Sequence, residues 1–577
     1  MSAPTPRTLC TAFQSTARVR PDQVALRTPD DSLALTWADY ARRVRSIARG
    51  LHALGVRRGD SVALMLTNRP EFHLLDCAAL HLGATPFSLY NTLATDQITH
   101  VLRNAGNRIV VCERQFAARL AAADTDRQVE HVVCVDGQPE GAVSLAELEG
   151  LPANDFDFDA SWQAVRPEDV ATIIYTSGTT GPPKGVELTH ANLLAELDAM
   201  AGILQAGPDD SVVSYLPDAH IANRWGSHYT GLAHGVQIIT LADHRQLVAV
   251  LPRVRPTLLG AVPQVWYKLK AGIEAKVAAE PVALKRKLAT WALATGAEVA
   301  RRESDRRPVP PLLRAQHRLA DRLVLAALRR RLGLDRVRFA VSGAAAIAPD
   351  ALAFVLGLGL PVCELWGMSE TSGVATINRP GRARLGTVGT VVPGGTELAT
   401  AEDGELLVRG PLVMRGYRGE PGKTAEAVDA EGWLHTGDIA TIDADGYVRI
   451  IDRKKELIIN SAGKNLSPAN IENAVKIACP LVGSVVAVGD DRPYVVALLT
   501  LDPDARAALA GDADVRALVE QGIHQGNSTL SRVEQVKKFV ILPGTWEPGG
   551  EELTPTMKLK RRAIITKYAG EIDGLYA

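Results

Sequence analysis

Short apolar runs alternate with helical patterns along most of this chain, and this alternation is the strongest constraint on its fold. Residues 60–67 (DSVALMLT) are typical of a buried strand, residues 70–82 of a helix, and residues 108–112 of the next strand. Apolar strands that are separated by helices are covered on both faces, so the pattern predicts an α/β body built on parallel sheets. The other predicted buried strands are 171–175, 211–216, 236–240, 257–262, 337–341 and 361–365.

One helix can be predicted together with both of its ends. Thr36 is a residue type that caps helix N-termini, and Gly55 is a type that ends helices. We therefore expect one helix from 36 to 54 with a single buried face. Its apolar residues recur at helical spacing, and they are Tyr40, Val44, Ile47, Leu51 and Leu54.

The length of the chain allows more than one folding unit. At 577 residues it exceeds the usual domain size of about 100–200 residues. Gly-rich turns and short strands fill 381–451, and the charged, polar segment DRKKELIINSAGKN follows. Such a break suits a hinge between domains. We predict an N-terminal domain at 1–451 and a smaller C-terminal domain at 452–577, and we find no internal repeat.

Composition excludes several classes of protein. Lys and Arg total 64, Asp and Glu total 65, and 46% of the residues are hydrophobic, so the formal net charge is −1. This balance excludes a disordered chain and argues against nucleic acid as a partner. The six cysteines form no CxxC pair and no Cys/His cluster, which argues against a disulfide scaffold or a structural zinc site. A reducing compartment fits this pattern.

No segment of the sequence resembles a secretory signal or a membrane span. The first residues, MSAPTPRTLCTAFQ, lack the basic-then-apolar order of a secretory signal. The most apolar run, 351–363, is shorter than the ~18–20 residues that a spanning helix needs. We therefore expect a soluble, cytoplasmic protein.

One stretch departs from the overall neutrality. Residues 285–338 hold fifteen Lys or Arg and five Asp or Glu, spread over helical patterns that prolines interrupt. We interpret about 285–335 as a basic helical insertion. Two interpretations remain open: a set of amphipathic surface helices, or a basic face that rests on anionic lipid headgroups at the inner face of a membrane.

The strongest motif is YTSGTTGPPKG, directly after the apolar run ATII. A loop that wraps phosphate oxygens needs glycines, hydroxyl residues and a lysine after a strand. The motif differs from GxxxxGK[ST], because its lysine precedes the final glycine. The candidate nucleotide-binding residues are Thr176, Ser177, Gly178, Thr179, Thr180, Gly181 and Lys184.

This loop resembles the signature loop of the adenylate-forming acyl-CoA synthetase superfamily. Further motifs follow in that family's order, so the resemblance spans about 35–562. It implies a large N-terminal body of parallel and mixed sheets covered by helices, and a small, mobile α+β C-terminal domain. It also implies two half-reactions: an acid and ATP give acyl-AMP and pyrophosphate, and the thiol of CoA then displaces AMP. The mobile domain would turn between these steps about a hinge at Asp452 to Lys455.

The segment WGMSE resembles the one whose carboxylate binds Mg²⁺ in this family. The resemblance gives the metal role to Glu370, with Thr176 as its partner across the ATP phosphates. It gives nucleotide-binding roles to Trp366, Gly367 and Ser369. The family more often has Thr at the position of Ser369, and the hydroxyl is retained here. Because Mg²⁺ keeps several waters, one carboxylate and the phosphate oxygens would suffice to hold it.

Three further segments resemble family elements around the nucleotide. In LHTGD, Asp438 would accept hydrogen bonds from the ribose hydroxyls, and Arg453 would contact the same sugar or its phosphate. In SGAAA, the small residues Gly343 and Ala344 would form the floor of the adenine site. In LTPTMKLKR, Lys558 would be the catalytic lysine, which neutralises charge when two anions react.

Two segments indicate the kind of acid. LPDAHIANR resembles the LPxxHxxxR of long-chain acyl-CoA synthetases, and VPQVW resembles the segment whose tryptophan gates their fatty-acid tunnel. His220 would shape the carboxylate or thiol end, and Trp266 would be the gate. Asp218 departs from the apolar residue that is common there. Together with SAGKN and the helical insertion, these segments favour a medium or long acyl chain, which an apolar tunnel can select.

The sequence thus predicts an AMP-forming fatty-acid–CoA ligase that uses ATP, Mg²⁺ and CoA, with fatty acid, ATP and CoA as substrates. An acyl-AMP ligase that loads an acyl carrier protein shares the first step and stays open as an alternative. A non-catalytic adenylate-binding protein is the third hypothesis. Oligomeric state, acyl length and pathway are left open. The predicted catalytic residues are Thr176, His220, Glu370 and Lys558.

Overall fold

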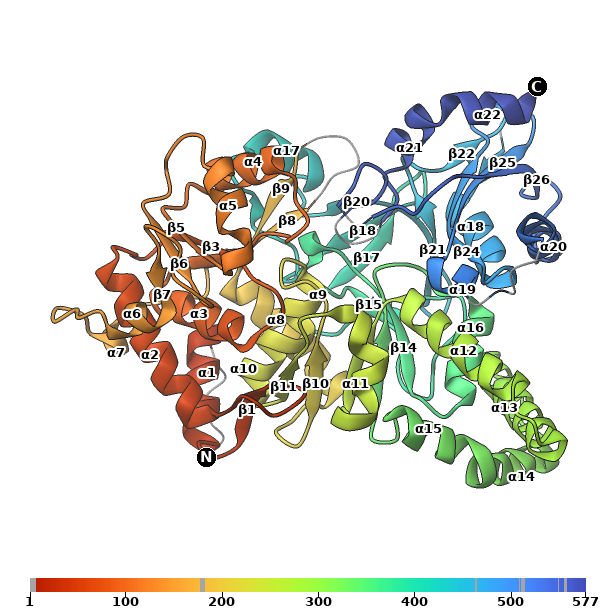
Figure 1. Ribbon diagram of the computed structural model, residues 1–577, viewed down its shortest axis with the longest axis horizontal. Coiled ribbons are helices and arrows are strands. Elements are labelled where there is room, and N and C mark those ends of the chain that lie inside the picture. Colours follow the sequence, from red (N-terminus) through yellow and green to blue (C-terminus); the bar gives the residue numbers. More distant parts are fainter. Residues whose placement is uncertain are drawn as a thin grey trace.

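The computed structural model in Figure 1 describes residues 7–176, 182–461, 464–507, 509, 514–547, 549–554 and 558–577. Its largest sheet has nine strands in the order β16-β15-β14-β13-β12-β10-β11-β1-β2. The strands from β1 to β14 in this order are parallel, and the outer strands β2, β15 and β16 pair antiparallel. They are β1 (Val24–Arg27), β2 (Ala34–Thr36), β10 (Ser211–Ser214), β11 (Gln237–Thr240), β12 (Leu258–Ala261), β13 (Phe339–Ser342), β14 (Val362–Trp366), β15 (Thr376–Ile377) and β16 (Thr390–Val391).

Alternate residues of these strands enter two different cores, as expected when a sheet is covered on both faces. In β11, Ile238 packs in one core and its neighbour Ile239 in the other. One core is covered by α1 (Leu9–Val19), α2 (Trp37–Ala53), α3 (Pro70–His81) and α8 (His190–Leu204). The other is covered by α11 (Leu247–Val254), α12 (Pro263–Ala278), α15 (Ala326–Leu332) and α16 (Pro349–Gly357).

The predicted helix after Thr36 is confirmed as α2. Thr36 and Asp39 form a capping box: the Thr36 hydroxyl accepts from the Asp39 N–H, and the Asp39 carboxylate accepts from the Thr36 N–H. Gly55 follows the helix with φ +90°, a conformation that glycine adopts without strain. Both ends of this helix therefore follow from local chemistry.

A second, five-stranded sheet lies beside the first, in the order β4-β3-β5-β6-β7. All of its pairs are parallel, which confirms the predicted strands 60–67 and 108–112. Its strands are β3 (Ser61–Met65), β4 (Thr85–Ser88), β5 (Ile109–Cys112), β6 (His131–Cys134) and β7 (Val143–Ser144). The nearby helices are α4 (Thr95–Ala105), α5 (Arg114–Ala123), α6 (Leu145–Gly150) and α7 (Phe158–Gln163).

The predicted strand 171–175 exists, but its expected parallel pairing is wrong. It is β8 (Val170–Thr176), and it pairs antiparallel with β9 (Lys184–Thr189). Parallel neighbours need a crossover of a dozen or more residues, and the connection 177–183 is too short for one. In a separate three-stranded sheet, β19 (Gly416–Tyr417) extends this pair antiparallel to β9. The phosphate-loop motif therefore joins two antiparallel strands.

A four-stranded antiparallel sheet leads to the C-terminal part of the chain. It comprises β17 (Glu397–Thr400), β18 (Glu405–Arg409), β20 (Leu434–Ile442) and β21 (Val448–Arg453), and α17 (Pro421–Ala427) precedes β20. Beyond it, drawn in blue at the upper right of Figure 1, lies a mixed α+β unit. Its elements are β22 (Ile458–Ile459), β23 (Asn465–Leu466), α18 (Pro468–Ala478), β24 (Val482–Val488), β25 (Val495–Leu501), α19 (Pro503–Ala507), α20 (Val515–Asn527), β26 (Val536–Ile541), α21 (Arg561–Lys567) and α22 (Ala569–Tyr576).

The basic stretch 285–338 is largely helical, as predicted. It holds α13 (Ala283–Ser304), α14 (Pro311–Ala320), the π-helical turn η3 (Asp321–Leu325) and α15, and Figure 1 shows these helices along the lower right edge. In the described part of the chain, no helix combines the length and the hydropathy that crossing a bilayer requires.

Candidate active site

Thr176 and Lys184 lie near the two ends of the phosphate-loop motif. Thr176 ends β8, Lys184 begins β9, and the two residues are cross-strand partners. Gly185 lies where a Cβ atom would come within 2.9 Å of Ile173 Cγ2, so a side chain there would disturb the strand pair. The predicted residues Ser177, Gly178, Thr179, Thr180 and Gly181 lie outside the described residues.

Lys184 and Glu370 both contact Tyr417. The Lys184 ammonium lies 4.6 Å from the centre of the Tyr417 ring, a cation–π contact. The Tyr417 hydroxyl donates to Glu370 Oε1 at 2.9 Å. Burial and the neighbouring Glu370 carboxylate raise the pKa of Tyr417, so this hydroxyl stays protonated. Sequence reasoning missed Tyr417, because it lies far from both partners along the chain and in no recognised motif.

The surroundings of Glu370 fit a magnesium ion. Glu370 lies in the short turn η4 (Ser369–Thr371) and is 7% exposed, and Ser369 beside it is also buried. Among the described residues, no hydrogen bond to Glu370 Oε2 is formed, so this oxygen is open to a cation. No group of three His, Cys, Asp or Glu side chains that could hold a metal ion occurs among the described residues. A single carboxylate suits Mg²⁺ that is bound mainly by phosphates and water.

Asp438 lies between Arg453 and Trp366. Asp438 and Arg453 are cross-strand partners in β20 and β21, and the Arg453 Nε lies 2.9 Å from Asp438 Oδ1. The Trp366 indole N–H donates to Asp438 Oδ2 at 2.8 Å. Burial raises the pKa of Asp438, and the Arg453 guanidinium offsets this only in part. The predicted ribose-binding residues are thus brought together on one hairpin beside the tryptophan.

Lys558 approaches the same place from the C-terminal unit. Leu553 and Leu559 form an antiparallel bridge, and the Lys558 carbonyl accepts from the Thr554 N–H, so Lys558 lies beside this bridge. Desolvation lowers the pKa of Lys558, as does the nearby Arg453 guanidinium. The carboxylates of Asp438, Glu370 and Glu456 act in the opposite direction. The lysine therefore lies within electrostatic range of both predicted binding groups.

His220 lies within electrostatic range of Lys558. It caps the short helix α9 (Ile221–Asn223), where its Nδ1 accepts from the Ala222 N–H at 3.1 Å. Burial, with a smaller effect of Lys558, lowers the pKa of His220 to about 4. The imidazole is therefore neutral at pH 7.

Small residues around Gly343 are required by packing within the protein. A Cβ at Gly343 would lie 2.6 Å from Leu365 Cδ1, and a Cβ at Gly367 would lie 2.0 Å from the Gly373 carbonyl oxygen. Ala344 has φ +68°, a left-handed conformation that is uncommon for alanine. The adenine-binding role of Gly343 and Ala344 stays a prediction, but their backbone geometry does need small side chains.

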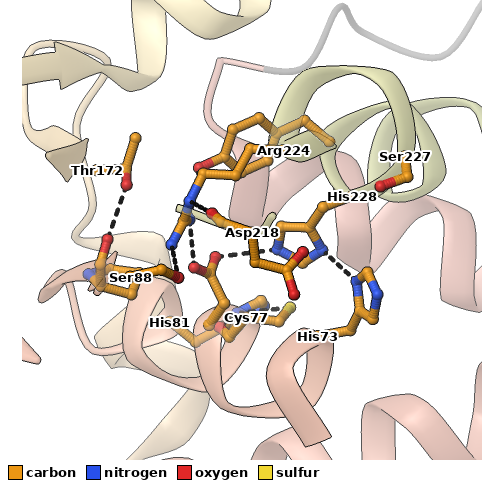
Figure 2. A network of polar contacts seen from close by, with 12 residues as sticks. His73, Cys77, His81, Ser88, Thr172, Asp218, Arg224, Ser227 and His228 are labelled. Atoms are coloured by element: carbon orange, nitrogen blue, oxygen red, sulfur yellow. Dashed lines mark hydrogen bonds and ion pairs between the residues drawn. The ribbon is translucent and has the colours of Figure 1, made fainter. Parts of the chain in front are cut away.

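A buried polar network holds the loop that carries His220 (Figure 2). Arg224 is fully buried and uses three of its nitrogens. Its Nη1 donates to Asp76 Oδ2 at 2.5 Å and to the Tyr229 hydroxyl, its Nη2 donates to Ser88, and its Nε donates to the Asp218 carbonyl oxygen at 2.9 Å. Arg224 thereby ties the loop after β10 to α3 and β4.

Two histidines and a second carboxyl complete the network. His228 Nε2 lies 2.9 Å from Asp76 Oδ1, and its Nδ1 lies 3.0 Å from the Nδ1 of His73 (Figure 2). Asp218 accepts from the Asn223 side chain at 2.6 Å, and burial raises the pKa of Asp218 to about 8. The LPDAHIANR motif marks Arg224, but the partners on α3 carry no sequence signal.

Trp266 lies in the core of the N-terminal part. It is 1% exposed, on α12, and packs with the buried residues Leu269 and Ile273. Its indole N–H has no hydrogen-bond partner among the described residues. The structure therefore places Trp266 with core residues, and its role as a gate stays a prediction.

The predicted hinge lies where β21 ends. The Asp452 carboxylate accepts from the Ser467 hydroxyl at 2.5 Å, and Ser467 caps α18. Lys454 forms an ion pair with Glu405 at 2.9 Å. Lys455 is exposed and forms no ion pair within the described residues. Asp452 thus contacts the C-terminal unit, and Lys454 contacts the N-terminal one.

Two family descriptions match this chain over nearly its whole length. They are "AMP-binding enzyme" over residues 13–418 and "AMP-binding enzyme C-terminal domain" over residues 455–577. The chain belongs to the AMP-binding enzyme family.

Curated relatives agree with this assignment. The chain is 53% identical over 451 residues, 76% of this chain and 79% of the relative, to fadD11 of Mycobacterium tuberculosis, whose name assigns it as a fatty-acid–CoA ligase. It is 35% identical over 564 residues, 94% of this chain and 92% of the relative, to the long-chain-fatty-acid–CoA ligase FadD15 of Mycobacterium bovis.

Solved structures share the fold. The anthranilate CoA ligase AuaEII, in complex with anthranoyl-AMP, has a TM-score of 0.77 at 19% identity and covers 99% of both chains. The adenylation domain of a carboxylate reductase from Mycobacterium chelonae has a TM-score of 0.78 at 19% identity and covers 100% of this chain and 92% of that one. At this identity, the likeness concerns the fold alone.

Proposed function

We propose that this protein is an AMP-forming fatty-acid–CoA ligase. The observation that carries the proposal is that Lys558, from the C-terminal unit, lies within electrostatic range of Glu370 and of Asp438, which itself contacts Arg453 and Trp366. A cation and two carboxylates drawn from distant segments suit a reaction that joins two anions. Relatives whose names give fatty-acid–CoA ligase activity support the same reaction.

In the first step, an oxygen of the fatty-acid carboxylate attacks the α-phosphorus of ATP, the bond to the bridging oxygen breaks, and pyrophosphate leaves. Lys558 and Lys184 neutralise the negative charge that develops on the phosphate oxygens. Asp438 accepts hydrogen bonds from the ribose, beside Trp366. Mg²⁺, when held by Glu370 and Thr176, supplies further charge neutralisation.

In the second step, the sulfur of CoA attacks the acyl carbon, AMP leaves, and the thiol proton is released. We propose that the C-terminal unit turns about Asp452–Lys455 between the two steps. The side chain of Lys455 is exposed, and the Asp452–Ser467 contact would move with the C-terminal unit. Lys558 would then leave the site and make room for the thiol.

We propose a medium- or long-chain fatty acid as the substrate. The support is the LPDAHIANR segment, whose Arg224 is locked in the buried network, and the names of the relatives. His220, neutral and close to Lys558, is suited to contact the reacting carboxylate or thiol without adding charge. Trp266 is proposed as the residue that limits access to the acyl site.

The test is acid-dependent exchange of pyrophosphate into ATP over a panel of fatty acids of increasing length. We expect exchange with medium or long chains, and acyl-CoA when CoA is added. Lack of exchange with every acid, in folded protein that binds ATP, would leave a non-catalytic adenylate-binding protein. Transfer to a phosphopantetheinyl carrier protein but not to CoA would identify an acyl-AMP ligase instead.

We also propose that the enzyme works at a membrane surface, which it reaches as a peripheral protein. The support is the excess of basic residues in the helices of 285–338, in a chain whose overall charge is −1. The rest of the chain therefore carries a net negative charge, and the basic region is the part that we expect anionic lipids to attract.

A further inference from the structure

An exposed apolar stripe runs along the outer side of α14 and η3. Leu312, Leu319 and Leu323 are 71%, 50% and 51% exposed, and they follow one another at one or two helical turns. Large apolar side chains scattered singly are ordinary on a protein surface, but three at helical spacing form a face. The opposite side of the same segment is packed, because Ala320 and Leu325 are fully buried.

A row of arginines lies next to these leucines. Arg314, Arg318 and Arg322 follow one another at successive helical turns, and all three are exposed. None of them forms an ion pair with any residue that the structure describes. We call these six residues the Leu–Arg face: Leu312, Arg314, Arg318, Leu319, Arg322 and Leu323.

The helices under this face are firmly held. On the preceding helix α13, Gly296 approaches α16 so closely that a Cβ would lie 2.2 Å from the Gly357 carbonyl oxygen. Backbone contact of this kind fixes α13, and α14 packs against α13. Figure 1 shows α14 at the lower right edge of the molecule, with the C-terminal unit at the upper right. The face can therefore make a contact without hindering the motion proposed for that unit.

We infer that the Leu–Arg face docks the enzyme onto a bilayer that contains anionic phospholipids. Leucines beside a row of arginines match the two layers of a membrane interface, because the leucines enter the acyl boundary while the guanidinium groups stay at the phosphates. The inference rests on the proposed function, since a long-chain fatty acid resides in such a bilayer.

Other occupants fit less well. A symmetric contact with a second copy would bring arginine rows of equal charge together. A carrier protein would offer acidic groups to the arginines. The apolar stripe, however, needs an apolar surface of its own length, and the acyl region of a bilayer is such a surface. The charge and the leucines together therefore favour lipid.

Vesicle flotation tests the inference directly. The full-length protein is mixed with vesicles of phosphatidylcholine and phosphatidylglycerol, or of phosphatidylcholine alone. We expect the wild type to float only with the anionic vesicles. The variant R314Q/R318Q/R322Q should bind them about a hundredfold more weakly at low salt. The variant L312Q/L319Q/L323Q, which keeps every charge, should also lose binding.

The matched control is R18Q/R20Q/R532Q, which removes the same charge from three exposed arginines that form no ion pair with described residues. It should bind as the wild type does. Equal binding by all variants would overturn the inference. The inference would also be overturned if sedimentation showed that the wild type is a dimer and the leucine variant a monomer. The same holds if either variant lost binding to an acidic carrier protein but floated with vesicles as the wild type does.

Pyrophosphate exchange with a soluble, medium-chain acid separates the two proposals. Every variant should exchange at the wild-type rate, because Figure 1 shows α14 at the lower right edge, away from β8, β9 and β20, which carry predicted nucleotide-binding residues. Flotation without exchange in the wild type would contradict the proposed function and leave the docking face intact. Exchange without flotation would contradict the docking face alone.

Discussion

Two aspartate–arginine pairs of this protein have opposite surroundings. Asp76 and Arg224 are both fully buried, and Arg224 also donates to other groups around it. Asp438 is nearly as buried as Asp76, but its partner Arg453 has a side chain that is 43% exposed. Burial raises the pKa of both carboxyl groups. Arg224 and His228 outweigh that effect and lower the pKa of Asp76, whereas the pKa of Asp438 stays raised.

The difference separates a structural pair from a binding pair. A buried carboxylate whose oxygens are satisfied by an arginine and a histidine has nothing left to offer a ligand. When neighbouring cations offset the cost of burying a carboxylate only in part, further hydrogen-bond donors stabilise its charge. The two hydroxyls of a ribose are such donors. The Asp76–Arg224 pair fixes the loop that carries His220, whereas the Asp438–Arg453 pair is suited to bind the nucleotide.

Asp76→Ala should give the largest loss of stability. It leaves the Arg224 guanidinium buried without its carboxylate, so we expect the free energy of unfolding to fall by about 3–5 kcal/mol. Urea denaturation followed by tryptophan fluorescence measures this. The double variant Asp76→Leu with Arg224→Met removes both charges and should recover at least half of the loss. An Asp76→Ala protein as stable as the wild type would contradict the structural role of the pair.

Lys558→Ala should give the largest loss of activity. Without this cation, pyrophosphate exchange should fall about 100- to 1000-fold, because charge on the phosphate oxygens is no longer neutralised. Breakdown of supplied acyl-AMP by CoA should continue at close to the wild-type rate. Lys538→Ala, an exposed lysine on β26, is the control. Equal loss in both half-reactions would contradict the role proposed for Lys558.

Asp438→Asn should affect binding rather than stability. We expect the KM for ATP to rise about tenfold, since one acceptor for the ribose is lost. The midpoint of urea denaturation should change little, in contrast to Asp76→Ala. Initial rates at varied ATP concentration give the KM, and urea denaturation of the same preparations gives the stability of the wild type and the variant. A large loss of stability in Asp438→Asn would remove the distinction between the two pairs.

Tyr417→Phe should have a smaller effect. It removes the hydrogen bond to Glu370 but keeps the ring under Lys184, so exchange at limiting Mg²⁺ should fall about threefold to tenfold. Tyr417→Leu, which also removes the ring, should be slower still. If both variants exchange at the wild-type rate, Tyr417 does not position Glu370.

The two pairs should also respond to pH in opposite directions, with effects of about 1 kcal/mol or less for Asp438. Asp76 has a lowered pKa, so its stabilisation is present above the unfolded value of ~3.9 and is lost as the pH falls through the folded pKa. Asp438 has a raised pKa, so the wild type should lose stability relative to Asp438→Asn as the pH rises from ~3.9 through that pKa. Denaturation of the wild type, Asp76→Asn and Asp438→Asn across the acid range measures both slopes. If both differences in stability changed in the same direction with pH, the opposite pKa shifts of Asp76 and Asp438 would be contradicted.

Local chemistry made most of the fold predictable. The capped helix α2 and the central parallel strands follow from spacing and from apolar runs, which need no distant partner to recognise. The pairing of β8 was predicted incorrectly, because an apolar run does not show in which direction its neighbour runs. The connection length was visible, and it would have indicated a hairpin.

In the candidate site, too, some residues could be predicted from the sequence and others could not. Motifs marked Asp438, Arg453 and Trp366, which the fold brings into contact. No motif marked Tyr417 or Asp76, because each acts through a partner on a remote segment. Trp266 matched a motif but lies among core residues, which is where a single tryptophan is most often found.

The sequence by itself determined the residue types, the order of the motifs and the periodicity of most helices and strands, since these depend on neighbours along the chain. Tertiary structure decided which charges face one another. It placed Lys558 within electrostatic range of Asp438, buried Arg224 against Asp76, and left the leucines of α14 and η3 exposed. The reason is physical: the pKa of a group depends on burial and on charges nearby in space, and residues far apart in sequence provide both.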